Sequence, residues 1–244
     1  MSDPTTVAVK GLAYAFGRHR VLDGLDLALP TGSTTVLLGA NGAGKTTLLR
    51  LLAGLLKPAA GTISVLGLDP ARQRDRLCAR LGFVPDTPDA WPWMTTEELG
   101  RFLAAHHPRW DDALATELRT SLGVPANRRL RDMSRGEATK AMLATTLGHA
   151  PEVLLLDEPF GGLDPIAHEE ILGCVVRALE VGTRTVLVST HDLDVAARLG
   201  DHVAVLAGGC IARIVPMEEA ATGTAPRREA LKGMFADVVR GERT

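Results

Sequence analysis

The sequence predicts an α/β fold: a sheet core with an antiparallel β subdomain at its N-terminus and an α-helical subdomain inserted within it. Three observations lead to this prediction. Helix-like and strand-like patterns alternate along most of the 244 residues, a glycine-rich stretch near residue 40 joins a predicted strand to a predicted helix, and residues 91–150 are almost wholly helical by pattern. Alternation of strands and helices is typical of a sheet that carries helices on its faces.

The first predicted elements are strands. Residues 5–38 alternate apolar and polar side chains and end in the apolar stretch TTVLL, which predicts short antiparallel strands that lead into a buried one. Residues 45–56 then have the apolar spacing of a helix. Two short strands are predicted after this helix, at residues 61–67 and 81–85.

The helical subdomain has a sequence signal at its start, because Thr95 and Glu98 have the spacing of a capping box. After this subdomain the alternation of strands and helices returns. The predicted elements are a buried strand at 152–159, a helix at 165–180, a strand at 185–190, a helix at 192–200 and a hairpin at 202–215. We therefore predict one domain over residues 5–215, followed by a charged, weakly helical and partly mobile tail at 216–244.

The composition is that of an ordinary globular protein, with 45% hydrophobic and 23% charged residues. The formal net charge of −2 provides no basic surface for phosphates, so no nucleic-acid partner is expected. No apolar run approaches the ~20 residues of a membrane-spanning helix, and the N-terminus lacks the apolar core of a signal peptide, which predicts a soluble, cytosolic chain. Cys78, Cys174 and Cys210 are widely spaced and are expected to be reduced packing residues.

A phosphate-binding loop is predicted at residues 39–47. The stretch GANGAGKTT matches the P-loop pattern GxxxxGK[ST] and lies between a predicted strand and a predicted helix, as that pattern requires. Its glycines let backbone N–H groups turn toward nucleotide phosphates, and the helix N-terminus adds partial positive charge. Lys45 would reach the β- and γ-phosphates, and Thr46 would bind Mg²⁺. The candidate nucleotide-binding residues of the loop are Gly39, Asn41, Gly42, Ala43, Gly44, Lys45, Thr46 and Thr47.

Two adjacent carboxylates end a later buried strand. VLLLDEP places Asp157 and Glu158 at the carboxyl end of that strand, where α/β sheets bind their ligands. Burial of both carboxylates without a cation would be costly, so Asp157 is a candidate to hold Mg²⁺ through water, and Glu158 to orient or deprotonate the attacking water. His191, at the end of the next strand, is a candidate to contact the γ-phosphate, although a histidine there is by itself more often a plain surface residue.

The motifs GANGAGKTT, MSRGE, LLLDEP, GGLD and STHD, in this order, resemble those of the ATP-binding subunits of ABC transporters. The resemblance runs from about residue 7 to residue 215 and implies an ABC-type P-loop ATPase that uses ATP and Mg²⁺. It also implies that Ser134 and Gly136 belong to the family signature, Asp164 to the D-loop, and that His191 is the switch histidine.

Two motifs depart from the family's usual residues. The usual signature LSGGQ is MSRGE here, so Arg135 replaces a glycine and Glu137 a glutamine. Asp86, in GFVPD, stands where the family usually has the Q-loop glutamine that contacts Mg²⁺. A carboxylate can still bind Mg²⁺, so Asp86 is a metal candidate beside Thr46 and Asp157. Arg135, together with the stretch HHPRWDD, resembles the ABC-2 branch, whose members are usually exporters.

Three aromatic positions have more than one interpretation. Phe16 matches the residue that stacks on adenine in the family, but a core position for Phe16 and stacking by Tyr14 are both open. Trp91 and Trp93 fall where family members form the groove for a helix of the membrane subunit. Burial of both rings in the core is an equally good interpretation of the same two residues.

The resemblance implies an ATPase subunit that drives transport, and its branch implies export. The helix that begins near Ser134 is expected to face the partner's γ-phosphate in a two-fold homodimer, so that each of two ATP sites needs both chains. Separately encoded membrane (permease) subunits would hold the chain at the cytoplasmic face of the cell membrane. A soluble ABC ATPase that serves a cytosolic assembly machine and a regulatory nucleotide-binding module of low turnover are the alternatives.

Overall fold

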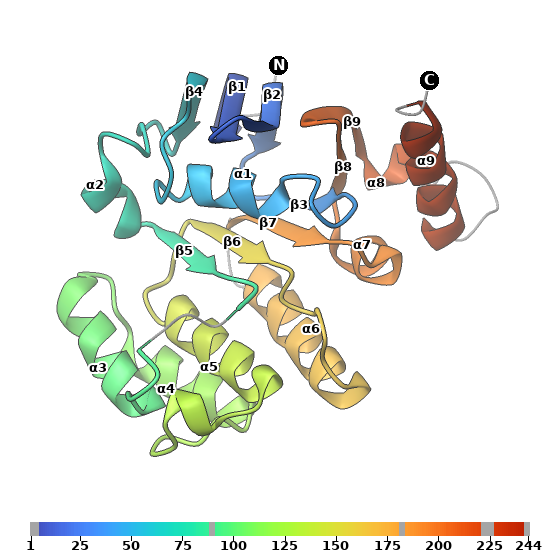
Figure 1. Ribbon diagram of the computed structural model, residues 1–244. Coiled ribbons are helices and arrows are strands. Elements are labelled where there is room, and N and C mark those ends of the chain that lie inside the picture. Colours follow the sequence, from blue (N-terminus) through green and yellow to red (C-terminus); the bar gives the residue numbers. More distant parts are fainter. Residues whose placement is uncertain (1–4, 88–90, 181–183, 221–226, 242–244) are drawn as a thin grey trace.

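The computed structural model describes residues 5–87, 91–180, 184–220 and 227–241. Within these residues, two β-sheets lie one above the other with a helix between them, and a group of helices lies below the larger sheet (Figure 1). The predicted class of fold is confirmed, because a sheet core, an antiparallel β subdomain and a helical insert are all present.

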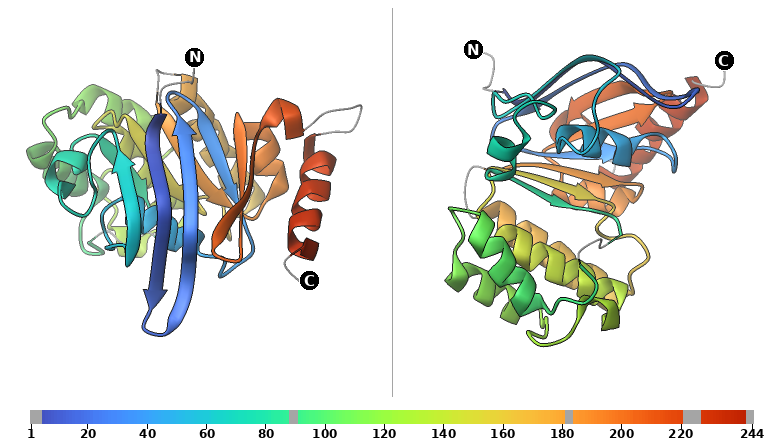
Figure 2. Two further views of the ribbon diagram at one scale, coloured as in Figure 1. Left: turned by 90° about the horizontal axis from the view of Figure 1, so that it is seen from above. Right: turned by 60° about the vertical axis from the view of Figure 1, so that its left-hand side comes forward.

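The smaller sheet contains the N-terminal strands in the order β2-β1-β4. Its strands are β1 (Thr5–Phe16), β2 (His19–Pro30) and β4 (Ala60–Val65), and β1 is antiparallel to both neighbours. Val7 and Val9 of β1 are fully buried, in agreement with the period-two pattern of the sequence. β1 and β2 extend together as a long ribbon (Figure 2, left), and Phe16 pairs with His19 at its turn.

The larger sheet has the strand order β5-β6-β7-β3-β8-β9. Its strands are β3 (Thr34–Leu38), β5 (Leu81–Val84), β6 (Val153–Asp157), β7 (Thr185–Thr190), β8 (His202–Ala207) and β9 (Cys210–Pro216). All neighbouring pairs are parallel except β8 and β9. Every residue of β3, β6 and β7 is buried, as expected for strands that are covered on both faces. The carboxyl ends of these three strands therefore meet at one edge, and the glycine-rich loop, Glu158 and His191 follow them there.

Two apolar clusters cover opposite faces of the larger sheet. On one face, α1 (Lys45–Leu52) packs between the two sheets, with α2 (Arg74–Cys78) in the same cluster. On the other face, α6 (Pro165–Glu180) and α7 (Leu193–Leu199) pack against the sheet. α1 ends at Leu52, before the predicted end at residue 56, because Gly54 turns the chain with a φ of 70°.

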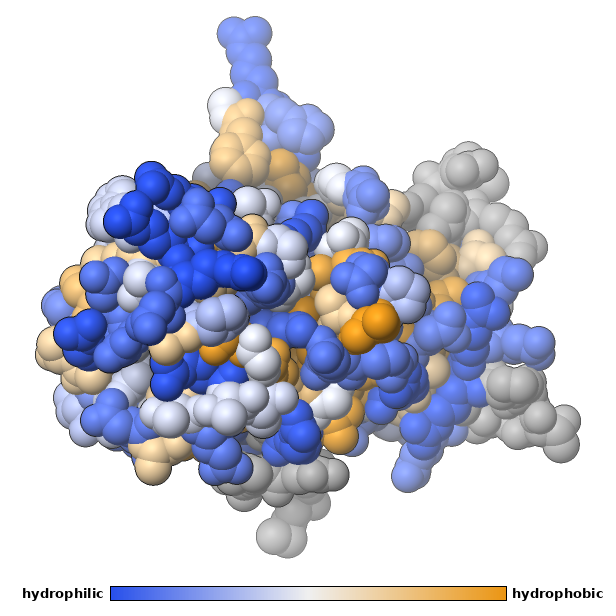
Figure 3. All heavy atoms as spheres, turned by 90° about the horizontal axis from the view of Figure 1, so that it is seen from below, coloured by the Kyte–Doolittle hydropathy of each residue, from blue (hydrophilic) through white to orange (hydrophobic). Residues whose placement is uncertain are grey.

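The helical subdomain consists of α3 (Thr96–His106), α4 (Asp112–Ser121), a 3₁₀ turn at Leu130–Asp132 and α5 (Arg135–Leu147). The predicted capping box of α3 is confirmed, since Glu98 N–H donates to Thr95 Oγ1 at 3.2 Å and Thr95 N–H donates to Glu98 Oε2 at 2.8 Å. The subdomain is less helical than predicted, because Gly123 ends α4 with a φ of 65° and Pro125 follows. Viewed from below, the molecule is mainly hydrophilic with small apolar areas (Figure 3).

The predicted tail contains two helices, α8 (Met217–Ala220) and α9 (Arg227–Gly241), while its residues 221–226 and 242–244 lie outside the described residues. α9 packs against α7 and buries Leu231 and Met234 in the same apolar cluster as α6 and α7. The part of the tail in α9 therefore packs on the core through apolar residues at helical spacing, while its mobility stays a prediction. None of the helices in the described residues is both long enough and apolar enough to cross a membrane.

Candidate active site

The glycine-rich loop connects β3 to α1, as predicted. Gly42 and Gly44 have positive φ angles, 82° and 105°. A Cβ at Gly44 would lie 2.9 Å from Leu22 Cδ2, and a Cβ at Gly39 would lie 2.8 Å from the carbonyl oxygen of Leu206. The loop therefore needs glycine for its backbone path and for close packing. A loop of this kind at a helix N-terminus is suited to bind phosphate.

Lys45 is the first residue of α1, and its side chain is almost fully buried. Its ammonium group donates hydrogen bonds to the carbonyl oxygens of Gly39, at 2.7 Å, and Ala40, at 3.2 Å. The same group lies 3.1 Å from Glu158 Oε1. The positive charge is thus held between the glycine-rich loop and a candidate catalytic carboxylate.

Asp157 ends β6 and is 1% exposed. Ser189 of β7 donates its hydroxyl proton to Asp157 Oδ1 at 2.7 Å, and the side chain of Thr46 forms a further hydrogen bond with Asp157. Burial raises the pKa of the Asp157 carboxyl above its usual value, since it penalises the charged form. A hydroxyl and a carboxylate are oxygen ligands that suit Mg²⁺, and a cation here would offset the cost of the buried charge. Thr46 and Asp157 therefore fit a Mg²⁺ site.

Glu158 has a φ of 44°, which is uncommon for a residue other than glycine and is typical of functional sites. Its backbone N–H donates to Ser189 Oγ at 3.0 Å. Its carboxylate lies between two groups, with Lys45 Nζ 3.1 Å from Oε1 and His191 Nδ1 3.0 Å from Oε2. The His191 side chain is 58% exposed, and its ring contacts the Glu158 carboxylate, so a role for His191 at the site stays a prediction.

Lys45, Thr46 and Glu158 line a hollow of about 300 Å³, whereas Asp157 and His191 are not among the described residues that line it. The described residues around it are Phe16, Val21, Asn41, Gly42, Gly44, Lys45, Thr46, Thr47, Asp86 and Glu158. Phe16 is 52% exposed and meets Tyr14 edge to face at 5.0 Å between ring centroids. Tyr14 packs against the core instead. Phe16 is therefore not a core residue, and its position at the hollow favours it over Tyr14 as the residue that could stack on a base.

The signature residues lie elsewhere on the same chain. Ser134 is the N-cap of α5 and forms a second capping box, in which Glu137 N–H donates to Ser134 Oγ at 3.2 Å and Ser134 N–H donates to Glu137 Oε2 at 2.9 Å. Ser134 is exposed beside a separate hollow. Gly136 is buried, and a Cβ there would lie 3.1 Å from Ala167 Cβ at the start of α6.

Asp164 is the last of the predicted nucleotide-binding residues. Its Oδ1 accepts hydrogen bonds from the N–H groups of Ile166 and Ala167, both at 3.0 Å. These hydrogen bonds hold the pKa of the Asp164 carboxyl below its usual value, and the bond from the Ala167 N–H has the largest effect. Asp164 therefore begins α6, and the structure brings neither it nor Ser134 and Gly136 into the hollow around Lys45.

Trp91 and Trp93 have different positions. Trp91 contacts Phe102 edge to face at 4.6 Å and lines an apolar hollow of about 280 Å³ beside the helical subdomain. Phe83 and Leu103 line the same hollow. Trp93 is 59% exposed and is not among the described residues that line it. The two rings are thus neither both in the core nor both in one groove.

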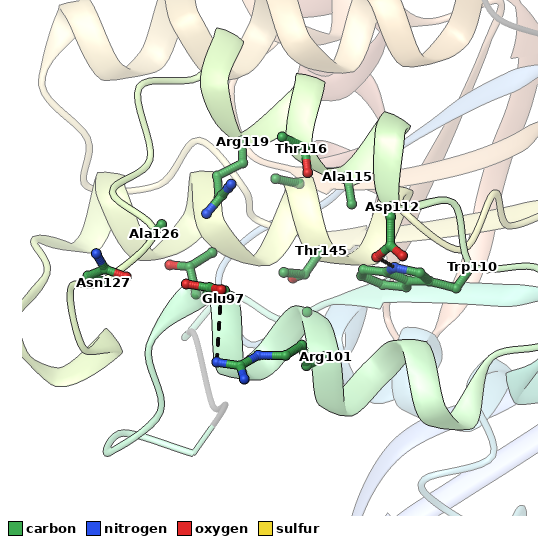
Figure 4. Close-up of a pocket in the computed structure, with 13 residues that line it drawn as sticks. Glu97, Arg101, Trp110, Asp112, Ala115, Thr116, Arg119, Ala126, Asn127 and Thr145 are labelled. Atoms are coloured by element: carbon green, nitrogen blue, oxygen red, sulfur yellow. Dashed lines mark hydrogen bonds and ion pairs between the residues drawn. The ribbon is translucent and has the colours of Figure 1, made fainter.

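A further hollow, of about 410 Å³, lies between α3, α4 and α5 (Figure 4). Two pairs of its lining side chains contact each other: Glu97 lies 3.9 Å from Arg101, and Trp110 Nε1 donates to Asp112 Oδ1 at 2.7 Å. The Trp110 ring packs on Gly148, where a Cβ would be 3.0 Å away. The described residues that line this hollow include no glycine-rich loop and no adjacent carboxylates, so the hollow does not resemble a nucleotide site.

Two features of the site were not predicted. The first is Ser189, which donates a hydrogen bond to Asp157 and accepts one from the backbone N–H of Glu158. The sequence signal for Ser189 is a hydroxyl residue two positions before the histidine of STHD. The second feature is a contact between the two departures from the family motifs, in which Arg135 Nη2 lies 2.5 Å from Asp86 Oδ1. No local pattern links positions that are 49 residues apart.

Known proteins are similar to this chain in both sequence and fold. The family model described as ABC transporter matches residues 22–161. The nickel import ATP-binding protein of Rhodobacter capsulatus is 41% identical over 240 residues, which cover 91% of this chain and 93% of the relative. The daunorubicin resistance ATP-binding protein DrrA3 of Streptomyces coeruleorubidus is 37% identical, with 94% and 71% covered. An aliphatic sulfonates import ATP-binding protein of Granulibacter bethesdensis is 36% identical, with 87% and 84% covered.

Solved structures agree with these relatives. The structure of the ATP-binding subunit of an ABC transporter superposes with a TM-score of 0.83, is 26% identical, and covers 96% of this chain and 100% of the other. A dimeric bacterial ABC transporter cassette superposes with a TM-score of 0.74 at 25% identity, covering 86% and 98%. The expectation of an export branch is not supported, because the relatives include import ATP-binding proteins. The chain belongs to the ABC transporter family, as an ATP-binding subunit that uses Mg²⁺ and hydrolyses ATP.

Proposed function

We propose that the chain hydrolyses ATP as one half of a two-fold homodimer and so drives transport through separately encoded permease subunits, at the cytoplasmic face of the membrane. The observation that supports the hydrolytic part is the position of Glu158. Its carboxylate is held between Lys45 and His191 in a hollow that the glycine-rich loop also lines. A carboxylate held in this way is suited to orient a water molecule and accept its proton.

In the proposed reaction, water attacks the γ-phosphate of ATP and ADP leaves in line. Lys45 would neutralise charge on the β- and γ-phosphates, and Phe16 would stack on the adenine. Glu158 would take the proton of the attacking water, while His191 would hold that carboxylate in place and contact the γ-phosphate. Mg²⁺ at Thr46 and Asp157 would neutralise phosphate charge, and Asp86, whose Oδ1 accepts a hydrogen bond from Arg135, would be a further candidate ligand.

The homodimer is proposed because three candidate nucleotide-binding residues, Ser134, Gly136 and Asp164, are not among the described residues that line the hollow around Lys45. Ser134 is exposed at the N-terminus of α5 and lies outside the hollow around Lys45. A two-fold arrangement would let Ser134, Gly136 and Asp164 of one chain approach the nucleotide held by the partner. The likeness to a dimeric ABC transporter cassette supports this arrangement.

The apolar hollow that Trp91 lines is the proposed contact for the permease. It lies where the helical subdomain meets the core, and Leu55, Phe83 and Leu103 present apolar surface in it. A helix of a membrane subunit could place its apolar side chains in such a groove. The named substrates of the relatives are nickel and sulfonates for import, and daunorubicin for resistance, so they favour no single cargo or direction.

A matched pair of variants tests the permease contact. Trp91→Asp would place a charge in the apolar hollow, whereas Trp93→Asp would place the same charge on an exposed position outside it. In membranes prepared from cells that make the whole transporter, Trp91→Asp should release the chain from the membrane fraction and Trp93→Asp should not. ATP affinity should be unchanged in both. A wild-type chain that hydrolyses ATP but never sediments with membranes would instead support a cytosolic assembly machine.

A further inference from the structure

Arg135 joins three segments of the chain. It is the first residue of α5, and its Nη2 donates to Asp86 Oδ1 at 2.5 Å and lies 3.4 Å from the Asp86 carbonyl oxygen. Its guanidinium also lies over the glycines that follow Glu158, because a Cβ at Gly161 or Gly162 would be 3.4 Å from one of its nitrogens. The side chain therefore links the helical insert, to which Arg135 belongs, with two segments of the core, one after β5 and one after β6.

Asp86 in turn faces the nucleotide hollow. It lines that hollow together with Lys45, Thr46 and Glu158, and its charge acts on the buried carboxyl of Asp157. Asp86 and Glu158 thus line the hollow where the phosphates of ATP are expected, the buried Asp157 lies within reach of their charges, and Lys45 is the one cation among the described lining residues. A third negative charge at this place would repel the nucleotide.

The pair is half-exposed, with 43% of the Arg135 side chain and 44% of the Asp86 side chain accessible. Ion pairs of this exposure contribute little to stability, because water screens them. Fold stability alone therefore does not explain why both positions carry a charge. Their common feature is that the two side chains touch and that Asp86 also lines the nucleotide hollow.

We propose that Arg135 is a positioning residue that neutralises Asp86 toward the nucleotide, so that ATP binds more tightly while Arg135 is paired with Asp86. The inference concerns ATP binding within one chain. It does not depend on the proposed dimer or on the proposed permease contact. The test measures ATP binding and not ATP hydrolysis, so its failure would not count against the proposed function, and a failure of the proposed function would not count against this inference.

The test measures the dissociation constant of ATP in EDTA for the wild type and three variants. Arg135→Gln leaves Asp86 without its partner and should weaken ATP binding about fivefold or more, within the range of interaction energies between contacting residues. Asp86→Asn removes the charge and should bind ATP at least as tightly as the wild type. The double variant Asp86→Asn/Arg135→Gln should return to within about twofold of the wild type, because no carboxylate is left to neutralise.

Two further variants act as controls. Arg131→Gln removes an exposed arginine near α5 that lies 3.7 Å from Asp132, outside the nucleotide hollow, and should leave ATP affinity unchanged. Arg135→Lys keeps the positive charge and should stay close to the wild type, which also guards against an Arg135→Gln chain that folds poorly. Two results would overturn the proposal. In one, Arg135→Gln weakens ATP binding by the same factor whether position 86 is aspartate or asparagine. In the other, Arg135→Gln leaves ATP binding unchanged in both backgrounds.

Discussion

Mixing two inactive variants tests whether each ATP site is built from both chains. Lys45→Ala removes the ammonium group that lies 3.1 Å from Glu158 and contacts the glycine-rich loop. Ser134→Glu places a carboxylate at the exposed N-terminus of α5, where it would meet the phosphates of the partner's nucleotide. Each variant alone should lose hydrolysis by orders of magnitude, because both sites of its homodimer carry the same lesion.

The expected recovery follows from the arrangement of the two lesions. In a heterodimer, the intact Lys45 of one chain meets the intact Ser134 of the other, while the second site has both lesions. Random exchange of equal amounts makes about half of the dimers mixed, and one working site of two gives about a quarter of wild-type phosphate release. If the loop and the signature acted within one chain, every site in the mixture would carry a lesion and no activity would return.

Controls separate this result from simple damage. Ser134→Glu also removes a helix cap, which costs about 1 kcal/mol, so thermal unfolding should show a folded chain. Ser121→Glu adds the same charge at an exposed serine that ends α4, and it should remain active. Labelled chains must show that subunits exchange, and wild type mixed with Lys45→Ala must show that one intact site turns over. If subunits exchange and a single intact site hydrolyses ATP, a mixture of the two variants without activity refutes the idea that each ATP site is built from both chains.

Three further predictions concern single positions. Glu158→Gln should bind ATP but slow phosphate release by about 10²–10⁴-fold, as expected for a lost general base, and gel filtration should show a long-lived dimer with ATP and Mg²⁺. Gly44→Ala should weaken ATP binding measurably by calorimetry, because φ is 105° and the new Cβ would be 2.9 Å from Leu22, whereas Gly173→Ala, with open space around it in α6, should bind normally. Leu231→Ala should lower the free energy of unfolding by about 2–5 kcal/mol in urea titrations, while Leu231→Met should cost under about 1.5 kcal/mol.

The parts of the site that the sequence predicted depend on short stretches of chain. The glycine-rich loop is recognisable because its backbone angles need glycine at Gly42 and Gly44 within a strand–loop–helix unit. The capping box at Thr95 follows from a spacing of three residues. The positions of Glu158 and His191 follow from two neighbouring strands that end at the same edge of the sheet.

The parts that escaped prediction depend on contacts between distant segments. Arg135 meets Asp86 across 49 residues, and the sequence shows both only as departures from a motif. Trp91 and Trp93 are neighbours in the chain, yet only Trp91 lines the apolar hollow, because packing on Phe102 decides its orientation. α9 has an apolar stripe that can be read in the sequence, but nothing in the sequence alone names α7 as its partner.

His149 allows a prediction about pH. It is 4% exposed and stacks on His107 with 4.2 Å between ring centroids. Burial, with a smaller effect of His107, lowers the pKa of His149 to about 4, below the value near 6.5 of an unfolded chain. Between these values the unfolded chain binds a proton that the folded chain does not, so the free energy of unfolding falls as pH decreases from about 6.5 to about 4.

The size of the loss and its controls make this prediction testable. Between pH 8 and pH 5 the loss from His149 should be about 2 kcal/mol, measured by urea unfolding at each pH. His149→Gln cannot take up the proton, so its free energy of unfolding should change less over this range by about that amount. His19→Gln removes an exposed imidazole at the start of β2 and should keep the wild-type profile. An unchanged pH profile in His149→Gln would show that His149 is not the group whose burial makes the fold sensitive to acid.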